Sequence, residues 1–442
     1  MLHSDTILAL ATPVGTGALA VLRLSGPAAL SLTAVVCGIT LQARRATLVQ
    51  LRDAEGRVLD TAVATYFAGP ASFTGENTVE FCCHGGMLVV QRVTERLLQL
   101  GARPAEPGEF SRRAFENGRM DLAQAEAVMD VISANSDMAL RAAQDQLQGE
   151  LSRRVQLAAD ALISVAAHNA AYIDFPQEDI APDTKEALLT QLADIRAQVQ
   201  ALLATADAGR VLREGVRTAI IGAPNVGKSS LLNLLLGYDR ALVSDTAGTT
   251  RDTVEETLRL RGLCLRLIDT AGLHESTDAI EQAGMERSRR ASAAADLVLE
   301  VVDISRPRVL QELPDNGAAR LLILNKCDLP AHSDWEGEHD AVRLCCRTGE
   351  GREALESRIS SLFLSSLSES DTPVAINTRH RYALAECDAA LARAEESLTL
   401  GESPEFTDLP LRDALDALGR ITGRIDTEDI LDRVFSTFCL GK

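Results

Sequence analysis

The feature that most constrains this chain is a glycine-rich segment near its middle, Gly222–Ser230, with the sequence GAPNVGKSS. It follows an apolar run that ends at Ile221 and precedes a second apolar run, Leu231 to Leu236. A strand, a loop of this spacing and a helix together predict a phosphate-binding loop, because glycines let the backbone wrap an anion and the helix N-terminus attracts it. Lys228 is expected to reach the outer phosphates, and the Ser229 hydroxyl to ligate Mg²⁺.

Two later segments each close an apolar run. The sequence DTAG at Asp269–Gly272 follows Leu263 to Ile268, and NKCD at Asn325–Asp328 follows Leu321 to Leu324. The first places a carboxylate near the metal. In the second, the Asp328 carboxylate can accept hydrogen bonds from the N1–H and 2-amino groups of guanine. Adenine offers neither donor, so the three motifs in this order predict binding of GTP rather than ATP.

A polar segment between these motifs, Gly248 to Asp252, is positioned to be a switch loop. Thr250 would supply the second hydroxyl on Mg²⁺, although taken alone the segment also fits a solvated turn. Leu273 follows Gly272, at the position where Ras-like enzymes carry the glutamine that orients water. Another group must therefore position the attacking water.

Composition limits the remaining possibilities. With 44 basic and 63 acidic residues, the net charge of −19 disfavours a chain that coats nucleic acid, so DNA is not an expected partner and RNA contact should be local. We find no secretory signal and no apolar run of membrane-spanning length, which predicts a cytoplasmic protein. The nine cysteines lack paired CxxC spacing, and we expect most to be reduced thiols.

The pattern along the chain predicts a multidomain α/β plus α protein. Short alternating runs such as Gly17–Leu24 and Thr61–Phe67 indicate an α/β domain over residues 1–118. Helical periodicity fills 119–214, including one stretch from Lys185 to Arg213, and returns in 372–442 from Asn377, Leu411 and Glu428. Buried parallel strands are expected in 215–371. A GTPase domain would thus interrupt a discontinuous helical bundle.

Further segments show a resemblance to a known family. They are FTGENTVEF at Phe73–Phe81, His84–Gly86, PGEFS at Pro107–Ser111, DLAQAE at Asp121–Glu126, LREG at Leu212–Gly215 and the terminal CLGK at Cys439–Lys442. Together with the GTPase motifs, they resemble the MnmE (TrmE) family of tRNA modification GTPases over nearly the whole chain. The resemblance implies an N-terminal domain like those that bind tetrahydrofolate, a helical bundle and an inserted Ras-like P-loop GTPase domain.

The same resemblance implies a function and partners. The chain would form a homodimer through its N-terminal domains and act with the flavoprotein MnmG, in a heterotetramer or larger complex. Together they would install an aminomethyl-type group at carbon 5 of the wobble uridine (U34) of certain tRNAs. The one-carbon donor would be 5-formyltetrahydrofolate or a related folate.

Family positions also supply roles for single residues. K⁺ would be held by Asn225, Ser244, Thr246 and Thr249, in place of an arginine finger, with activity raised when two GTPase domains meet. Glu281 matches the position proposed to orient water, although an exposed acidic helix residue is the alternative. The folate positions are Arg23, Glu80, Arg119 and Lys442, with Arg119 where lysine is common.

The full predicted nucleotide site combines the motifs and the family positions. Its residues are Asn225, Val226, Gly227, Lys228, Ser229, Ser230, Ser244, Asp245, Thr246, Ala247, Gly248, Thr249, Thr250, Asp269, Thr270, Ala271, Gly272, Asn325, Lys326, Asp328, Cys345, Cys346 and Arg347. The last three replace the usual Ser-Ala-Lys or Ser-Ala-Arg of the base-covering loop, so the serine hydroxyl is lost. His274 stands where arginine is common.

Several alternatives stay open. Cys439 has either a redox or nucleophilic role in tRNA modification, beside the catalytic roles of Lys228 and Glu281, or it only packs. The run Cys82-Cys83-His84 suits no common zinc site. At the level of function, a ribosome-assembly GTPase switch shares the nucleotide motifs, but it usually brings a basic RNA-binding tail. A folate-dependent aminomethyl-transfer enzyme with an accessory GTPase domain is the third possibility.

Overall fold

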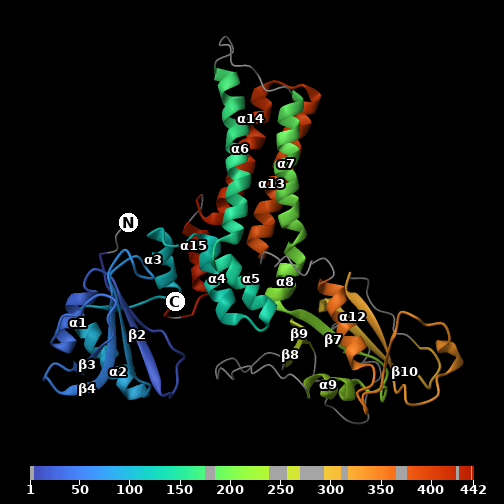
Figure 1. Cartoon of the computed structure of the whole chain (residues 1–442), viewed down its shortest axis with the longest axis horizontal. Coiled ribbons are helices and arrows are strands. Elements are labelled where there is room, and N and C mark those ends of the chain that lie inside the picture. The colour runs from blue at the N-terminus through green and yellow to red at the C-terminus, as the bar shows by residue number, and fades with distance from the viewer. Residues whose placement is uncertain are drawn as a thin grey trace. The chain divides into compact units, whose positions relative to one another are not determined.

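The computed structural model describes residues 4–174, 185–237, 256–268, 293–309, 317–364, 376–424, 428–439 and 441–442 (Figure 1). Contacts divide the chain into two compact units. The first joins Met1–Met129 with Leu415–Lys442, and the second is Asp130–Ala414. Each unit contains one six-stranded sheet.

The sheet of the first unit has the strand order β3-β4-β5-β2-β1-β6. Its strands are β1 (Ile7–Leu10), β2 (Leu19–Ser25), β3 (Thr47–Arg52), β4 (Val58–Phe67), β5 (Thr78–His84) and β6 (Arg103–Pro104). All neighbours are antiparallel except β1 and β6. Residues alternate between the two faces, and α1 (Ala29–Cys37) and α2 (Met87–Gln99) pack on the face that carries the buried Leu22, Leu24 and Phe81.

Two more helices belong to this unit, α3 (Glu109–Glu116) and α15 (Glu428–Ser436). They meet through Phe115 and Phe435, whose ring centroids are 6.4 Å apart. Gly108, just before α3, has φ +71°, and a Cβ there would lie 2.4 Å from the Phe435 carbonyl oxygen. Glycine is therefore required for the C-terminal helix to pack against α3.

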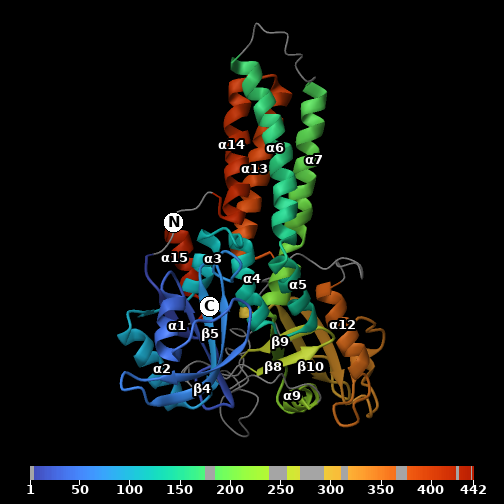
Figure 2. The same cartoon turned by 60° about the vertical axis from the view of Figure 1, so that its left-hand side comes forward.

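The second unit begins with helices. Its members are α5 (Asp137–Leu147), α6 (Glu150–Asp174), α7 (Lys185–Ala204), α8 (Ala206–Glu214) and α13 (Thr378–Leu400), while α4 (Leu122–Ser133) and α14 (Pro404–Thr422) each cross the unit boundary in sequence. Figures 1 and 2 show α6, α7, α13 and α14 side by side. The guanidinium of Arg196 on α7 binds Asp388 at 2.8 Å and Glu395 at 2.7 Å, both on α13. Helices before and after the GTPase segment thus form one bundle, as predicted.

Two helix limits differ from the prediction. The stretch from Lys185 to Arg213 is interrupted at Thr205, whose side chain and backbone N–H both bind the Leu202 carbonyl oxygen instead of continuing α7. Helix α14 begins at Pro404 rather than at Leu411. Proline is well tolerated in the first turn of a helix, because its missing N–H would have no intrahelical partner there.

The sheet of the second unit has the order β12-β11-β10-β7-β9-β8. Its strands are β7 (Val216–Ile221), β8 (Glu256–Leu260), β9 (Leu263–Leu267), β10 (Leu297–Asp303), β11 (Ala319–Asn325) and β12 (Val342–Leu344), with α9 (Lys228–Leu236) and α12 (Arg352–Leu364) beside them. Only β8 runs antiparallel to its neighbour. The apolar runs that end at Ile221, Ile268 and Leu324 correspond to the buried strands β7, β9 and β11.

The GTPase segment and the helical segment share a hydrophobic core. Ala142 on α5 and Leu212 on α8 belong to the same buried cluster as Leu258 and Leu265 of the sheet. At the β8–β9 turn, a Cβ on Gly262 would lie 3.1 Å from the Sδ atom of Met138 on α5.

The predicted fold class, multidomain α/β plus α with an inserted P-loop domain, is confirmed. The four predicted domain limits stay predictions. Within the described ranges, no helix is both long and apolar enough to cross a membrane.

Candidate functional site

The loop between β7 and α9 has the backbone shape that its glycines predict. Gly222, Asn225 and Gly227 have φ values of +147°, +63° and +107°. A Cβ on Gly222 would lie 2.2 Å from the Val301 carbonyl oxygen, and one on Gly227 would lie 2.1 Å from Nδ2 of Asn325. Both glycines are therefore required for this loop to pass so close to its neighbours.

Lys228 is the first residue of α9. Its Nζ atom donates hydrogen bonds to the carbonyl oxygens of Gly222 at 2.8 Å and Ala223 at 2.9 Å, so the ammonium group lies over the loop. Burial lowers the pKa of Lys228 from its usual value. Ser229 and Ser230 follow in the first turn of α9 and are exposed. An anion at this N-terminus would meet the helix dipole and the lysine together.

The end of β11 is joined to this loop by hydrogen bonds. Asn325 is buried, and its Nδ2 donates to the Val226 carbonyl oxygen at 2.8 Å. Lys326 has φ +65°, and its Nζ contacts the Asn225 carbonyl oxygen at 3.1 Å and Asp303 at 2.6 Å. Burial alone would raise the pKa of Asp303, but bonds from Lys326 and a neighbouring serine hold the pKa below its usual value.

The carboxylate predicted to read the base, Asp328, is held by the segment after β12. The Cys345 thiol donates to Oδ1 of Asp328 at 3.1 Å, and the Arg347 guanidinium binds Oδ2 at 2.9 Å. These bonds, with that from Cys345 the larger, lower the pKa of Asp328 and keep it ionised. The backbone N–H of Cys346 donates to Oδ1 of Asn325 at 3.2 Å. The cysteine thiol therefore takes a bonding role here although the family's serine is absent.

These contacts bring the described half of the predicted nucleotide site together. The loops after β7, β10, β11 and β12 meet at the carboxyl edge of the sheet, where open α/β sheets bind ligands. Asp303 was missed by the sequence analysis, although its place at the end of an apolar strand was a usable signal. The remaining predicted residues, Ser244 to Thr250, Asp269 to Gly272 and Glu281, lie outside the described residues.

A second set of predicted residues meets in the first unit. Arg23 on β2 and Glu80 on β5 face each other in register, and the Nε and NH2 groups of Arg23 both lie 2.9 Å from Oε1 of Glu80. The Arg23 guanidinium also lies 5.3 Å from the ring centroid of Phe73 and 5.6 Å from that of Phe110. The two rings lie in segments that resemble the family. They were not predicted as site residues, because they come from separate parts of the sequence.

The C-terminal tail reaches the same place. The Gly441 carbonyl oxygen accepts a hydrogen bond from Arg23 at 3.3 Å, and a Cβ on Gly441 would lie 2.4 Å from the Leu10 carbonyl oxygen. Lys442 is half-buried, and burial together with the charge of Arg23 lowers its pKa. Cys439 is exposed. We call Arg23, Glu80, Phe73, Phe110 and the tail the arginine site.

Arg119 is the fourth predicted folate residue. It is exposed, and its side chain passes the loop that carries Phe73, since a Cβ on Gly75 would lie 3.3 Å from Cγ of Arg119. Among the interactions of the described residues, none joins Arg119 to Arg23 or Glu80. The structure thus brings Arg23, Glu80 and the C-terminal tail together and places Arg119 by the neighbouring loop.

Comparisons with known proteins find similar chains and domains. A model of the N-terminal domain of the GTP-binding protein TrmE matches residues 6–119, and a model of the MnmE helical domain matches residues 122–439. The tRNA modification GTPase MnmE of Akkermansia muciniphila is 58% identical over 444 residues, which covers 99% of both chains. The protein of that name from Opitutus terrae is 44% identical over 452 residues, again covering 99% of both.

Among solved structures, the FeoB G-domain from Methanococcus jannaschii is 25% identical to this chain. The match covers 34% of this chain and 97% of that one, with a TM-score of 0.25. A likeness at that score supports no conclusion.

Proposed function

Because the chain belongs to the family of the tRNA modification GTPase MnmE, we infer that it is a GTP-hydrolysing enzyme of tRNA modification. We propose that it acts with an MnmG-type flavoprotein to install an aminomethyl-type group at carbon 5 of the wobble uridine of certain tRNAs. A folate, 5-formyltetrahydrofolate or a relative of it, would supply the one-carbon unit. The enzyme would work in the cytoplasm.

The observation that best supports GTP as the substrate is the joining of the phosphate loop to the base-reading segment. Asn325 donates a hydrogen bond to the Val226 carbonyl oxygen, which joins the loop that would hold the phosphates to the segment that carries Asp328. Asp328 is ionised and held in place by Cys345 and Arg347, and can accept the guanine N1–H and 2-amino groups. Preorganisation of this kind reduces the entropic cost of binding.

We propose that two cations bind at this site. The exposed Ser229 hydroxyl, beside Lys228 at the start of α9, would ligate Mg²⁺ together with Thr250. The exposed Asn225 side chain would hold K⁺ with Ser244, Thr246 and Thr249. These ions would neutralise charge on the phosphates in the transition state. The chain's own contribution is to orient the phosphates through Lys228 and the loop amides, and the attacking water through Glu281.

The arginine site supports the folate proposal through its donor and acceptor pattern. Pterin and guanine share a 2-amino-4-oxopyrimidine edge, which presents two neighbouring N–H donors to a carboxylate. Arg23 binds only Oε1 of Glu80, and none of the hydrogen bonds among the described residues reaches Oε2. Glu80 would therefore read the pterin edge as Asp328 reads guanine. The cationic Arg23 and Lys442 are suited to the anionic tail of a folate.

The homodimer proposal is supported by a partly exposed apolar row on the first sheet. Leu48, Val63, Cys82 and Val21 form one row across β3, β4, β5 and β2, on the face opposite α1 and α2. Leu48 and Val63 are 72% and 40% exposed. Apolar side chains arranged in this way are typical of surfaces that a second copy covers. The net charge of −19 opposes general affinity for nucleic acid, so tRNA would bind at a local surface.

Nucleoside mass spectrometry of tRNA from cells that lack this protein tests the proposal. We expect loss of the modified wobble uridine, and its return when the unaltered chain is supplied. The matched control is Lys228→Ala, which should leave the modification absent because nucleotide turnover is lost. Wobble uridines that are equally modified with and without the chain would contradict the proposal.

A further inference from the structure

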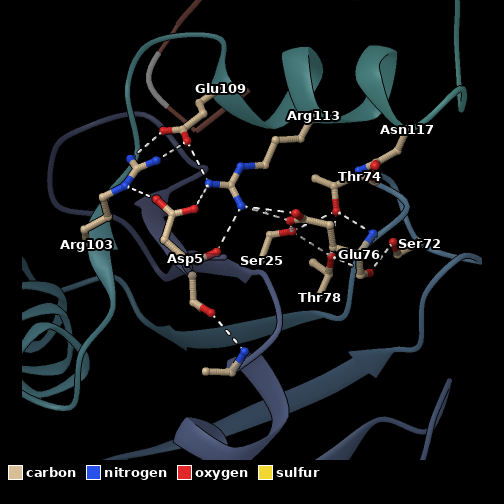
Figure 3. A network of polar contacts seen from close by, with 12 residues as sticks. Asp5, Ser25, Ser72, Thr74, Glu76, Thr78, Arg103, Glu109, Arg113 and Asn117 are labelled. Atoms are coloured by element: carbon tan, nitrogen blue, oxygen red, sulfur yellow. Dashed lines mark hydrogen bonds and ion pairs between the residues drawn. The ribbon is translucent and has the colours of Figure 1, made fainter. Parts of the chain in front are cut away.

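A partly buried ionic network, which Figure 3 shows, lies beside the arginine site. The Arg113 guanidinium of α3 is fully buried and contacts Glu76 at 3.2 Å, Glu109 at 2.9 Å and Asp5 at 2.9 Å. Arg103 on β6 pairs with the same Asp5 and Glu109 carboxylates. Three carboxylates and two guanidinium groups from separate segments thus form one cluster, which we call the Arg113 network.

Stability alone explains such a network poorly. Taking charges out of water costs energy that a buried ion pair often only just recovers, and apolar side chains of similar volume commonly serve as well. What charged networks of this kind do provide is a single, specified geometry. The place of the network in the fold therefore indicates which geometry it maintains.

Both aromatic rings of the arginine site belong to residues whose sequence neighbours are bonded to the network. Phe110 follows Glu109 at the start of α3. Phe73 lies between Ser72, whose hydroxyl donates to the Glu76 carbonyl oxygen, and Thr74, whose hydroxyl bonds that of Ser25 at 2.7 Å. The two segments that carry the rings are thus joined to one another through Arg113, Glu76 and Glu109.

The strand that carries Arg23 is attached as well. Ser25 is two residues further along β2, so its side chain lies on the same face of the sheet as that of Arg23. Ser25 is buried, and its hydroxyl donates to Oε2 of Glu76 at 2.8 Å. Arg23 and the two rings are therefore held by β2, by the segment that carries Phe73 and by α3. Arg113 contacts Glu76, which is bonded to the first two, and Glu109, which begins the third.

We propose that Arg113 is a positioning residue: by joining Glu76 to Glu109, it holds Phe73 and Phe110 against the Arg23 guanidinium and keeps the arginine site shaped for its ligand. This rests on the proposed function only in taking folate as that ligand. Arg113 itself would not touch the folate.

The test uses the full chain and two readouts. The first is the solvent-exchange rate of the Arg23 Nε–H, followed by NMR and assigned by its loss in Arg23→Lys. The second is the dissociation constant of 5-formyltetrahydrofolate from calorimetry. The main variant is Arg113→Met with Glu76→Gln, which removes the cation together with one carboxylate. A second variant, Arg113→Lys, keeps the positive charge but lacks the guanidinium group that binds several carboxylates at once.

The matched control is Arg112→Met. Arg112 is the next residue of α3 and also forms two ion pairs, with Glu116 and Asp432, but it is outside the network. We expect the double variant to exchange the Arg23 proton about tenfold faster and to bind folate about tenfold more weakly. Arg113→Lys should fall between it and the unaltered chain. Arg112→Met should change both quantities by less than about twofold, because both of its partners lie outside the arginine site.

A folded double variant that keeps both quantities within about twofold of the unaltered chain overturns the proposal, as does faster exchange with undiminished folate affinity. If the double variant does not fold, Arg113→Lys decides by the same two quantities. If the unaltered chain binds no folate, the folate assignment fails, and the exchange rate alone then decides the role of Arg113. Faster exchange supports it, and an unchanged rate refutes it.

Discussion

Gly227→Ala should abolish tight GTP binding through the geometry of one carbon atom. At φ +107°, a residue with a Cβ costs about 1–3 kcal/mol in backbone strain. The new Cβ would also lie 2.1 Å from Nδ2 of Asn325. The Asn325 side chain must then move and lose its bond to Val226, which costs about 1–3 kcal/mol for a buried amide left unpaired.

The variant loop can relieve this strain only by changing its conformation, and the changed loop no longer fits the phosphates. The strain therefore appears as a loss of GTP-binding free energy. A loss of at least 2 kcal/mol corresponds to about thirtyfold weaker binding or more. Equilibrium titration with a fluorescent GTP analogue and Mg²⁺ measures it. The matched control is Gly317→Ala, two residues before β11, where φ is +74° but nothing lies within 4 Å. Gly227→Ala binding within about twofold of the unaltered chain would refute the reasoning.

Four other predictions follow, three from the two sites and one from the turn at Gly262. Asp328→Asn places an amide donor against the donors of guanine, so GTP affinity should fall about tenfold or more. Xanthosine triphosphate carries an accepting oxygen in place of the 2-amino group, so it should gain affinity in the same titration. If Asn225 holds K⁺, GTP turnover should fall sharply when Na⁺ replaces it, and equal rates in the two salts would contradict that role. Cys439→Ser should leave GTP hydrolysis near normal while wobble-uridine modification falls, and unaltered modification would contradict a role for this exposed thiol in the modification. Gly262→Val should lower the free energy of unfolding by about 1–3 kcal/mol in thermal denaturation, because φ is +85° and Met138 lies against the turn. An unchanged free energy of unfolding would contradict this reasoning.

The sheet and the loop of the GTPase segment were predictable from sequence because their signals are local. The apolar runs that became β7 and β11 are continuous, and each is followed directly by the residues of its motif. Strand ends in a parallel sheet meet at one edge, so the pairing of Asn325 with the loop follows from topology. The exact ends of helices were less predictable, because a single hydroxyl at Thr205 decides where α7 ends.

The arginine site could be predicted only in part. Family positions gave Arg23, Glu80 and Lys442, but nothing in the spacing of Phe73 and Phe110 indicates that both rings face one guanidinium. The same limit applies to Arg113, since its partners come from three separate parts of the sequence and their burial is a property of the folded unit.

Calorimetry of GTP with the purified chain in Mg²⁺ tests the central claim most directly, since the account depends on GTP held between Lys228 and Asp328. We predict saturable heat at one nucleotide per chain, absent with ATP and absent in Lys228→Ala. No heat with GTP, or equal heat with GTP and ATP, would contradict the account.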